Sequence, residues 1–268
     1  MTLIQLAAMS CLALGQVAAP PMQPQQGEAA AQLKAFAQIA VKEVAGFRLR
    51  SPDDEGRKFT LREAPVLKYT NPVSGSMNGN VFLWTVGARP EVVAAVFQFP
   101  GYPLSVECHS LSEKQLEVVR DDGVTWRPAV AGVELRAVPA ARIPAESRGG
   151  RLVQMRELAR QFTAERTEPD GQHVPLRLLP QPIYRYEEGD DDRDGALFAF
   201  VEGTNPDVLL ILEAHDTAGA KAWHFAAARL HHRTMQLRLG DQVVWEVKQL
   251  TNAEKSMPEQ PYFIFRRN

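Results

Sequence analysis

The sequence predicts a mixed α+β protein of two tandem repeats, each one helix followed by an antiparallel meander of about five strands. Three observations lead to this prediction. A segment of the first half recurs without a gap in the second half. An amphipathic helical pattern opens each half, and short apolar segments separated by Gly and Pro turns follow it.

The internal match is centred on Gly79–Val93 (GNVFLWTVGARPEVV) and Gly195–Leu209 (GALFAFVEGTNPDVL). The identical pairs are Gly79/Gly195, Phe82/Phe198, Gly87/Gly203, Pro90/Pro206 and Val92/Val208. The match continues outward in the same order, through Pro65–Tyr69 with Pro182–Tyr186 and Asp122–Trp126 with Asp241–Trp245. Colinear matches of this kind predict an internal duplication. The alternative is two unrelated hairpins that share common turn chemistry.

Apolar residues at three- and four-residue steps predict the two helices. The first apolar stripe consists of Leu33, Phe36, Ile39, Ala40, Val44 and Phe47. Gly46 stands where that helix would stop. The second stripe consists of Leu152, Met155, Leu158, Ala159 and Phe162, and the opposite face carries Arg151, Arg156, Arg160 and Gln161. We expect each helix to cover the apolar face of its own sheet.

Strands follow each predicted helix, and two matching hairpins stand out. The first pairs Val81–Val86 with Glu91–Phe99, and the second pairs Leu197–Glu202 with Asp207–Glu213. Gly87 and Gly203 supply the unusual φ that such loops need. Further strands are expected at Lys221–Leu230, Thr234–Leu239 and Gln242–Lys248.

The N-terminus is typical of a secretory signal. Leu3–Leu14 is mostly apolar but too short to span a bilayer, and small residues suited to cleavage follow it. The region before it lacks Lys and Arg, so a buried apolar helix is the alternative. We therefore expect an extracytoplasmic protein, periplasmic or secreted. Its predicted division is a signal peptide at 1–19, a linker at 20–28, and repeat units at 29–148 and 149–268.

Composition places the chain among ordinary globular proteins. Its 268 residues are 45% hydrophobic and 23% charged, and the net charge is −2. This charge gives no reason to expect a nucleic-acid partner. After cleavage Cys108 is the single cysteine, so no intramolecular disulfide can form. We expect no integral membrane segment in the mature chain.

The sharpest local motif is the acidic loop Glu187–Asp194 (EEGDDDRD). Asp190, Asp192 and Asp194 lie at alternate positions before Gly195, which is how calcium loops collect carboxylate ligands. Against calcium, Val201 takes the position where such loops carry Glu, and a strand rather than a helix follows. A solvated acidic turn is the alternative.

Two further groups invite a chemical interpretation. His224, His231 and His232 could ligate a metal, but no cysteine or carboxylate completes a familiar spacing, which favours turn histidines. Cys108–His109 resembles a nucleophile–base pair, but neighbours in a strand point to opposite faces. The sequence lacks the serine-hydrolase, zinc-protease and nucleotide-binding motifs, so we predict no catalytic residue and no cofactor beyond the calcium possibility.

Four segments resemble an uncharacterised family of predicted exported bacterial proteins. They are LKYTNPVSG (Leu67–Gly75), GNVFLWT (Gly79–Thr85), VQMRELARQF (Val153–Phe162) and DGALFAFVEGTNPDVLLILEA (Asp194–Ala214). The resemblance covers most of the mature chain. It implies an extracytoplasmic location, and it implies no activity, cofactor or catalytic residue.

The expectation for function is an exported non-enzymatic module that binds a protein partner or a small ligand. The natural place for a ligand is the junction between the two repeats. The alternatives are a hydrolase-type enzyme with its site at that junction and a calcium-stabilised envelope protein. Convergent His, Ser, Asp or Glu side chains at the junction would favour the enzyme.

Overall fold

The computed structural model describes residues 24–71, 77–188, 193–217 and 220–266. The predicted signal peptide at 1–19 lies outside these residues, as do Asp190 and Asp192 of the acidic loop. The protein is mixed α+β and mostly β, with 49% strand and 14% helix. This confirms the predicted fold class in its coarse form.

Each half of the chain opens with a helix, α1 (Pro24–Ala45) and α2 (Arg148–Ala159). The strands after α1 are β1 (Phe47–Arg50), β2 (Phe59–Leu61), β3 (Leu67–Asn71), β4 (Met77–Val86), β5 (Arg89–Gln98), β6 (Ser105–Ser110), β7 (Glu117–Arg120), β8 (Thr125–Trp126) and β9 (Arg136–Ala137). The elements after α2 are β10 (Phe162–Thr167), β11 (His173–Leu178), β12 (Tyr184–Glu188), β13 (Arg193–Glu202), β14 (Asn205–Thr217), β15 (Ala220–Arg229), β16 (Thr234–Leu239), β17 (Gln242–Val247), the 3₁₀ turn η1 (Glu254–Ser256) and β18 (Tyr262–Arg266).

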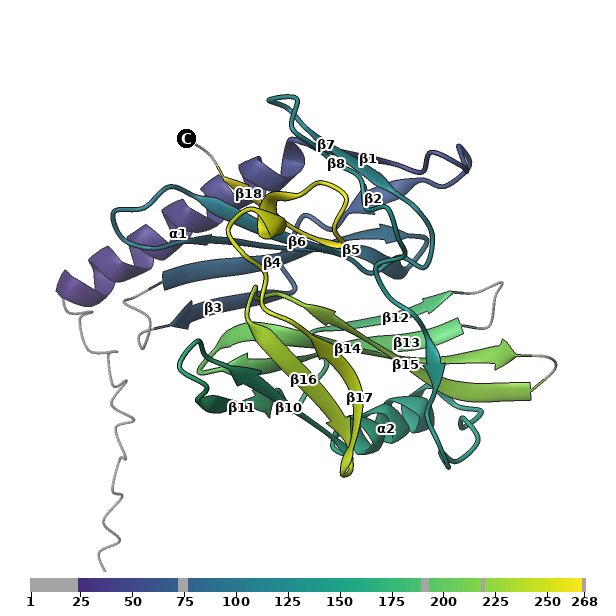
Figure 1. Ribbon diagram of the computed structural model, residues 1–268. Coiled ribbons are helices and arrows are strands. Elements are labelled where there is room, and N and C mark those ends of the chain that lie inside the picture. The colour runs from purple at the N-terminus through teal and green to yellow at the C-terminus, as the bar shows by residue number, and fades with distance from the viewer. Residues whose placement is uncertain (1–23, 72–76, 189–192, 218–219, 267–268) are drawn as a thin grey trace, which may run out of the picture.

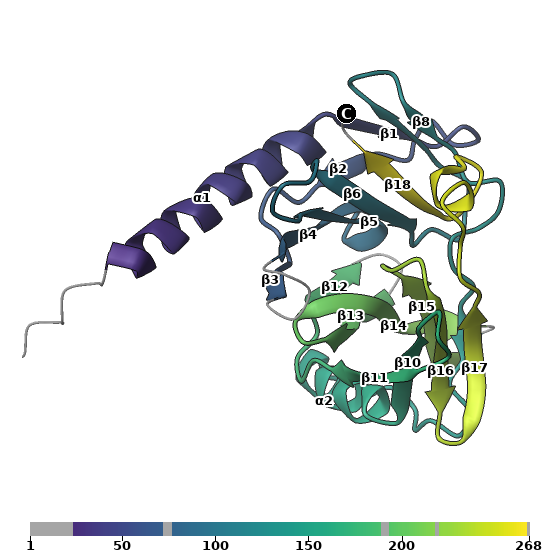
Figure 2. The ribbon, with the colours of Figure 1, turned by 60° about the vertical axis from the view of Figure 1, so that its left-hand side comes forward.

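Two large sheets stack face to face, and one helix lies on the outer side of each (Figures 1 and 2). The first sheet has the order β18-β6-β5-β4-β2, with β3 also on β4. The second has the order β17-β16-β10-β11-β13-β14-β15-β9, with β12 also on β13. A small sheet, β1-β7-β8, completes the first half. We call the buried layer between the two large sheets the seam.

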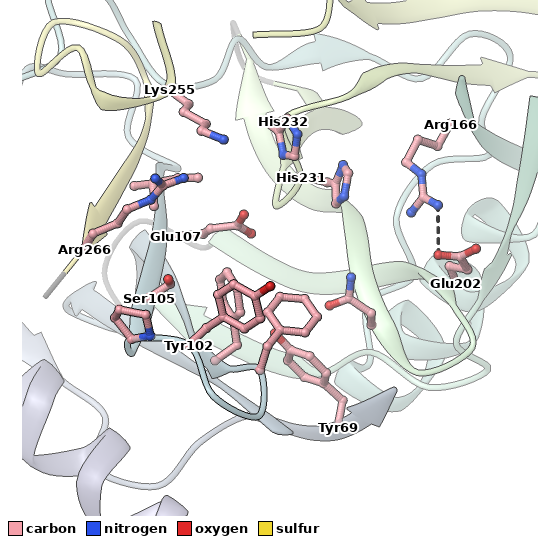
Figure 3. Close-up of a pocket in the computed structure, with 15 residues that line it drawn as sticks. Tyr69, Tyr102, Ser105, Glu107, Arg166, Glu202, His231, His232, Lys255 and Arg266 are labelled. Atoms are coloured by element: carbon pink, nitrogen blue, oxygen red, sulfur yellow. Dashed lines mark hydrogen bonds and ion pairs between the residues drawn. The ribbon is translucent and has the colours of Figure 1, made fainter. Parts of the chain in front are cut away.

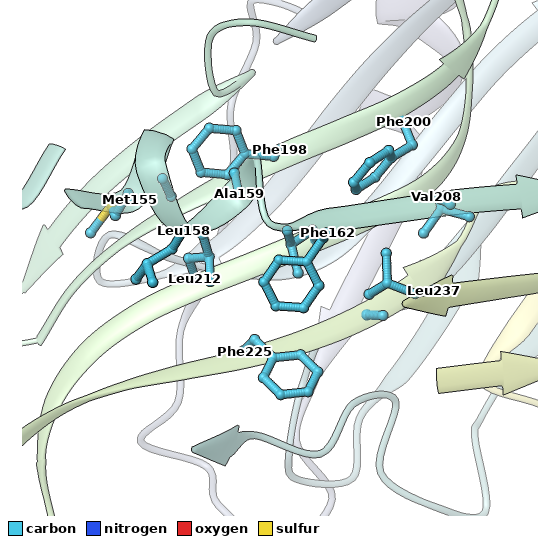
Figure 4. Close-up of a cluster of buried hydrophobic side chains, with 14 of the residues drawn as sticks. Met155, Leu158, Ala159, Phe162, Phe198, Phe200, Val208, Leu212, Phe225 and Leu237 are labelled. Carbon is cyan, nitrogen blue, oxygen red and sulfur yellow. The ribbon is translucent and has the colours of Figure 1, made fainter. Parts of the chain in front are cut away.

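Alternating side chains of the central strands build three apolar layers. In β4, Val81 and Leu83 enter the seam. Their neighbours Phe82 and Trp84 face α1. In β13, Phe198 packs in the outer cluster beneath α2, together with Met155 and Phe162 (Figure 4). Both faces of these strands are therefore buried, which explains their nearly continuous apolar sequence.

The helices differ from expectation in three respects. The first begins at Pro24, inside the predicted linker, because Gln, Glu and Ala favour helix and Pro is tolerated at its first position. Leu33 and Ile39 of the predicted stripe are exposed. The N-terminal part of α1 projects beyond the sheet (Figure 2). Arg151, assigned to the polar face of α2, is buried because it forms ion pairs with Asp194 and Glu187.

Several strand pairings recur in both halves, although β10 also pairs with β11 whereas β1 lies in a separate sheet from β2. In the first, β1 pairs with β7, β7 with β8, and β4 with β2, β3 and β5. In the second, β10 pairs with β16, β16 with β17, and β13 with β11, β12 and β14. The order is therefore more complex than the expected five-stranded meander, since β16 returns to β10 instead of pairing with β15.

The two central hairpins also share fine details. Gly87 and Gly203 have φ of 58° and 59°, as their hairpin positions predict. The register shifts at Trp84/Thr85 in one hairpin and at Phe200/Val201 in the other.

A tyrosine lies flat over a glycine of each hairpin. A Cβ atom on Gly79 would meet the ring of Tyr69, and one on Gly195 would meet the ring of Tyr186.

The halves exchange their edge strands. β9, which follows the strands of the first half, pairs with β15 in the second sheet. β18, at the end of the chain, pairs with β6 in the first sheet. The predicted boundary at 148/149 falls in the first turn of α2, and each large sheet contains a strand from the other half.

Candidate functional site

A cavity of about 800 Å³ opens at one end of the seam (Figure 3). We call it the seam cavity. Strands of both sheets line it, together with the segment around η1. One wall is aromatic, and the other carries the polar residues Glu107, Arg166, His231, His232 and Lys255. A cavity of this size can enclose a small organic molecule.

The aromatic wall comes from β3, β5 and the turn that follows β5. It consists of Tyr69, Phe97, Phe99 and Tyr102. The rings of Phe97 and Phe99 meet edge to face, with centroids 5.9 Å apart. Phe99 and Tyr102 are related in the same way at 6.4 Å. Such rings offer an apolar surface to a ligand.

Glu107 is the buried acid of the cavity. It lies in β6, where Ser105, Glu107 and His109 alternate with Val106 and Cys108 of the outer core. The Tyr262 hydroxyl donates a 2.8 Å hydrogen bond to Glu107 Oε1. Burial raises the pKa of Glu107 to about 8 despite this hydrogen bond, and the nearby Asp207 carboxylate adds to the rise. Glu107 is therefore mostly neutral at pH 7.

The two cavity histidines lie in the turn after β15. The Arg229 guanidinium fixes this turn by donating to the carbonyl oxygens of His231 and Arg233, at 2.8 and 2.5 Å. The Arg233 amide donates to His231 Nδ1, so the proton of this ring is on Nε2. Burial lowers the pKa of His231 well below its usual value and that of His232 to about 4. Both imidazoles are neutral at pH 7.

Each nitrogen of the Arg166 guanidinium donates a hydrogen bond to a carboxylate. Its guanidinium donates to Asp207 Oδ2 at 2.5 Å, to Glu202 Oε2 at 2.8 Å and to Glu168 Oε1 at 2.8 Å. Asp207 also accepts a 3.0 Å hydrogen bond from the Asn205 side-chain amide. Burial raises the pKa of Asp207 to about 7, and Arg166 opposes that rise. This part of the wall is electrostatically satisfied.

Lys255 differs from Arg166. It lies in η1, and only 6% of its surface is exposed. Within the part of the chain that the structure describes, its ammonium group makes no hydrogen bond and no ion pair. Figure 3 shows that group pointing into the seam cavity, on the side opposite the aromatic wall.

At the other end of the seam, which we call the closed end, buried charged side chains link the two sheets. Arg89 Nε donates to Glu213 Oε1 at 2.8 Å, and the Tyr186 hydroxyl donates to the same oxygen at 2.5 Å. Arg89 also pairs with Glu91, which Arg57 contacts from the other side. Glu213 is fully buried, and its carboxylate keeps the pKa of Arg89 above its usual value.

The two ends occupy matching positions in the two halves. Glu213 is paired with Gly195, and Phe97 is paired with Gly79. Arg89 and Asn205 each follow the hairpin glycine by two residues. Where the closed end has a long Arg that reaches a Glu, the open end has a short Asn and an apolar Phe.

The predicted calcium ligands are only partly within the described residues. Asp190 and Asp192 lie outside them. Asp194 is buried, and its carboxylate pairs with Arg151 and with Arg185 Nη2, the latter at 2.6 Å. In the described ranges no group of three His, Cys, Asp or Glu side chains is arranged to hold a metal ion. Calcium at this loop stays a prediction.

The other residues singled out from the sequence are separated. His224 stacks on His215, with ring centroids 4.0 Å apart, whereas His231 stacks on His232 at the seam cavity. Cys108 packs in the outer core, and burial raises its pKa. The His109 ring faces the other way and contacts the Ser110 carbonyl oxygen through Nδ1 at 2.8 Å. The prediction that these neighbours point apart is confirmed.

Sequence reasoning missed Glu107, Arg166, Lys255 and the aromatic wall. One signal was available for Glu107, because an acidic residue alternates with apolar ones in Ser105–Ser110. No such signal marks Lys255, which reaches the cavity through the connection between β17 and β18.

Comparison of this chain with protein-family models, with curated proteins and with solved structures finds no match. In the described segments, no helix combines the length and apolar character needed to cross a membrane.

Proposed function

We propose that this protein is an exported, non-enzymatic module that binds a small organic ligand in the seam cavity. The cavity itself carries this proposal. It lies between two sheets and has an aromatic wall and a polar wall, whereas Arg89 and Glu213 form a buried pair at the opposite end of the seam. Pockets that combine apolar surface with a few convergent polar groups are typical of small-molecule sites.

We also propose that the two halves are copies of one unit. The shared pairings, the matching register shifts and the paired tyrosine–glycine contacts support a duplication. A ligand site between two copies is what a fused dimer offers. Divergence at one end of the seam would then have produced the cavity.

Binding of the neutral fluorescent dye N-phenyl-1-naphthylamine tests the proposed function. We expect saturable binding of one dye per chain. Ser105 lines the cavity, so Ser105→Trp should fill it and weaken dye binding at least tenfold. Thr163→Trp is the matched control, because it adds the same bulk at an exposed position of β10. Equal dye binding by the two variants would contradict a ligand site in the cavity.

An enzyme at the same junction is the second candidate. The observation in its favour is that Ser105, Glu107, His231 and His232 converge on the cavity, and that burial raises the pKa of Glu107 to about 8. Perturbed acids in cavities often serve as general acids or bases. Against it, none of the described lining residues forms a hydrogen-bonded pair of a hydroxyl with a histidine.

Hydrolysis of p-nitrophenyl acetate, phosphate and glucoside distinguishes the two candidates. A binding module leaves each rate at that of buffer. An enzyme gives a rate above buffer that Glu107→Gln removes while the folded state, measured by circular dichroism, is retained.

The proposal of export has its own test. Expression of the full chain in a bacterium, followed by fractionation and N-terminal sequencing, should give a periplasmic or secreted protein that starts within residues 16–20. An uncleaved cytoplasmic product would contradict export and leave the ligand site untouched.

A further inference from the structure

We infer that the seam cavity selects a small amphipathic organic anion, with Lys255 pairing its carboxylate, sulfonate or phosphate group and the aromatic wall holding its apolar body. This inference rests on the proposed function, because it names the ligand class of the same site. Three features carry it: a buried lysine without a hydrogen-bond partner among the described residues, cavity acids that are bound to other groups, and a wall of aromatic rings on the opposite side.

The buried cation is Lys255. It is 94% buried, and it aims its ammonium into the seam cavity (Figure 3). No hydrogen-bond acceptor or carboxylate within residues 24–71, 77–188, 193–217 and 220–266 contacts that ammonium. Burial lowers the pKa of Lys255, and the charge of Arg266 at the rim adds to the effect, whereas Glu107 opposes it. An ammonium that faces a cavity without an acceptor among the described residues can give a bound anion a charge-assisted hydrogen bond.

The acids of the cavity leave the charge of Lys255 uncompensated. Asp207 and Glu202 accept from Arg166. Glu107 accepts from Tyr262 and is mostly neutral at pH 7, because burial raises its pKa to about 8. The polar wall therefore carries a net positive charge from Lys255, with Arg266 at the rim.

The neighbouring histidines favour a ligand that carries a hydrogen-bond acceptor. The His231 ring keeps its proton on Nε2, because its Nδ1 accepts from the Arg233 amide. It is a donor of fixed tautomer on the same wall as Lys255. Ligand oxygens can thus receive a charge-assisted hydrogen bond from Lys255 and a neutral one from the imidazole wall.

The aromatic wall argues against a bare inorganic anion. Tyr69, Phe97 and Phe99 face the polar wall across a cavity of about 800 Å³. Phosphate or sulfate alone would leave these rings in contact with water, whereas an aromatic or branched apolar body would cover them. The ligand class that satisfies both walls is an organic acid with its charge at one end.

Two dyes that differ in one group test the inference. The anionic 8-anilinonaphthalene-1-sulfonate and the neutral N-phenyl-1-naphthylamine share the same rings, and only the first has a sulfonate. At pH 7 we expect the wild-type protein to bind the anionic dye at least tenfold more tightly. Lys255→Met should remove that preference and change the affinity for the neutral dye less than twofold. Lys255→Arg should keep most of the preference.

Lys248→Met is the matched control, since Lys248 is an exposed lysine of the same connecting segment. It should leave both affinities unchanged.

Equal affinities for the two dyes in the wild type, or a preference that survives Lys255→Met, would overturn the inferred ligand class. The proposed function would still stand if Ser105→Trp blocked the neutral dye. If Ser105→Trp blocked neither dye, both the ligand class and the cavity site would be overturned.

Discussion

The two ends of the seam are built from matching positions and have opposite characters. At the closed end Arg89, Glu213 and Tyr186 form a buried hydrogen-bonded cluster. At the open end the matching positions carry Asn205, Phe97 and Tyr69, and a cavity remains. At the closed end an ion pair joins the two halves, and at the open end a cavity lies between them.

The comparison teaches that two matching ends of one seam can differ in how far their charges are compensated. Charges of the closed end compensate one another inside the protein, so removal of one leaves the others buried with less compensation. At the open end Lys255 has no hydrogen-bond or ion-pair partner among the described residues, so its removal leaves no other charge without its partner. The two ends should therefore respond oppositely to substitution.

The largest expected effect is at the closed end. Glu213→Ala leaves Arg89 buried without its main carboxylate, and we expect it to lower the free energy of unfolding by about 3–5 kcal/mol in urea denaturation. Removing both charges in Arg89→Met/Glu213→Leu should cost less than Glu213→Ala alone. A loss below about 1 kcal/mol for the single variant would contradict a structural role for this pair.

The tyrosine–glycine contacts give the next comparison. A Cβ atom on Gly195 would lie 2.3 Å from Tyr186 Cζ, and one on Gly79 would lie 2.0 Å from Tyr69 Cζ. Tyr186 is held by Glu213, whereas Tyr69 borders the cavity and has room to move. We therefore expect Gly195→Ala to lower the unfolding free energy by about 2–3 kcal/mol and Gly79→Ala by about 1 kcal/mol.

Gly149→Ala is the control for that pair, because a Cβ atom there meets nothing within 4 Å. It should be neutral or slightly stabilising within α2. The opposite order of losses at Gly195 and Gly79 would show that the open end is as rigid as the closed one.

The third prediction concerns pH. Folding raises the pKa of Glu107 from 4.5 to about 8, so the folded protein retains a proton that the unfolded chain releases. The free energy of unfolding should therefore fall as pH rises through this range. The charged groups facing Glu107 are Asp207 from β14, Lys255 from η1 and Arg229 from β15, with the Tyr262 hydroxyl from β18. Asp207, whose pKa is raised to about 7, contributes in the same direction.

Glu107→Gln should reduce the loss of stability between pH 6.5 and pH 9 by roughly 1–2 kcal/mol, as measured by denaturation at each pH. The exposed Glu259→Gln is the control and should keep the wild-type profile. Identical slopes for Glu107→Gln and the wild type would indicate that Glu107 is already ionised in the folded protein.

The smallest expected effect is at Lys255. Lys255→Met should raise the unfolding free energy by up to about 0.5 kcal/mol, because it removes a charge that has no hydrogen-bond partner within the described chain. Thermal denaturation without ligand measures this. A loss as large as that of Glu213→Ala would mean that the folded chain itself compensates Lys255.

Local features of the fold could be predicted from the sequence. The hairpins at Gly87 and Gly203 depend on φ angles that glycine adopts readily, so short-range chemistry specifies them. The burial of Phe36, Ala40 and Val44 follows from helical spacing alone. Both kinds of signal are contained within a few neighbouring residues.

The features that could not be predicted depend on distant partners. Arg151 belongs to a polar stripe in the sequence, yet Asp194, which lies far along the chain, holds it in the interior. Whether the seam is open at Asn205 or closed at Arg89 depends on the residue that the other half places opposite. Lys255 enters the cavity from a connection whose path no periodicity reveals.

The exchange of β9 and β18 has a consequence for the timing of folding. The first sheet is complete only after β18 (Tyr262–Arg266) has been synthesised. Until then, one edge of β6 has no neighbouring strand. Ile264 of the same strand lines the cavity. The seam cavity is therefore complete only after this strand has paired with β6.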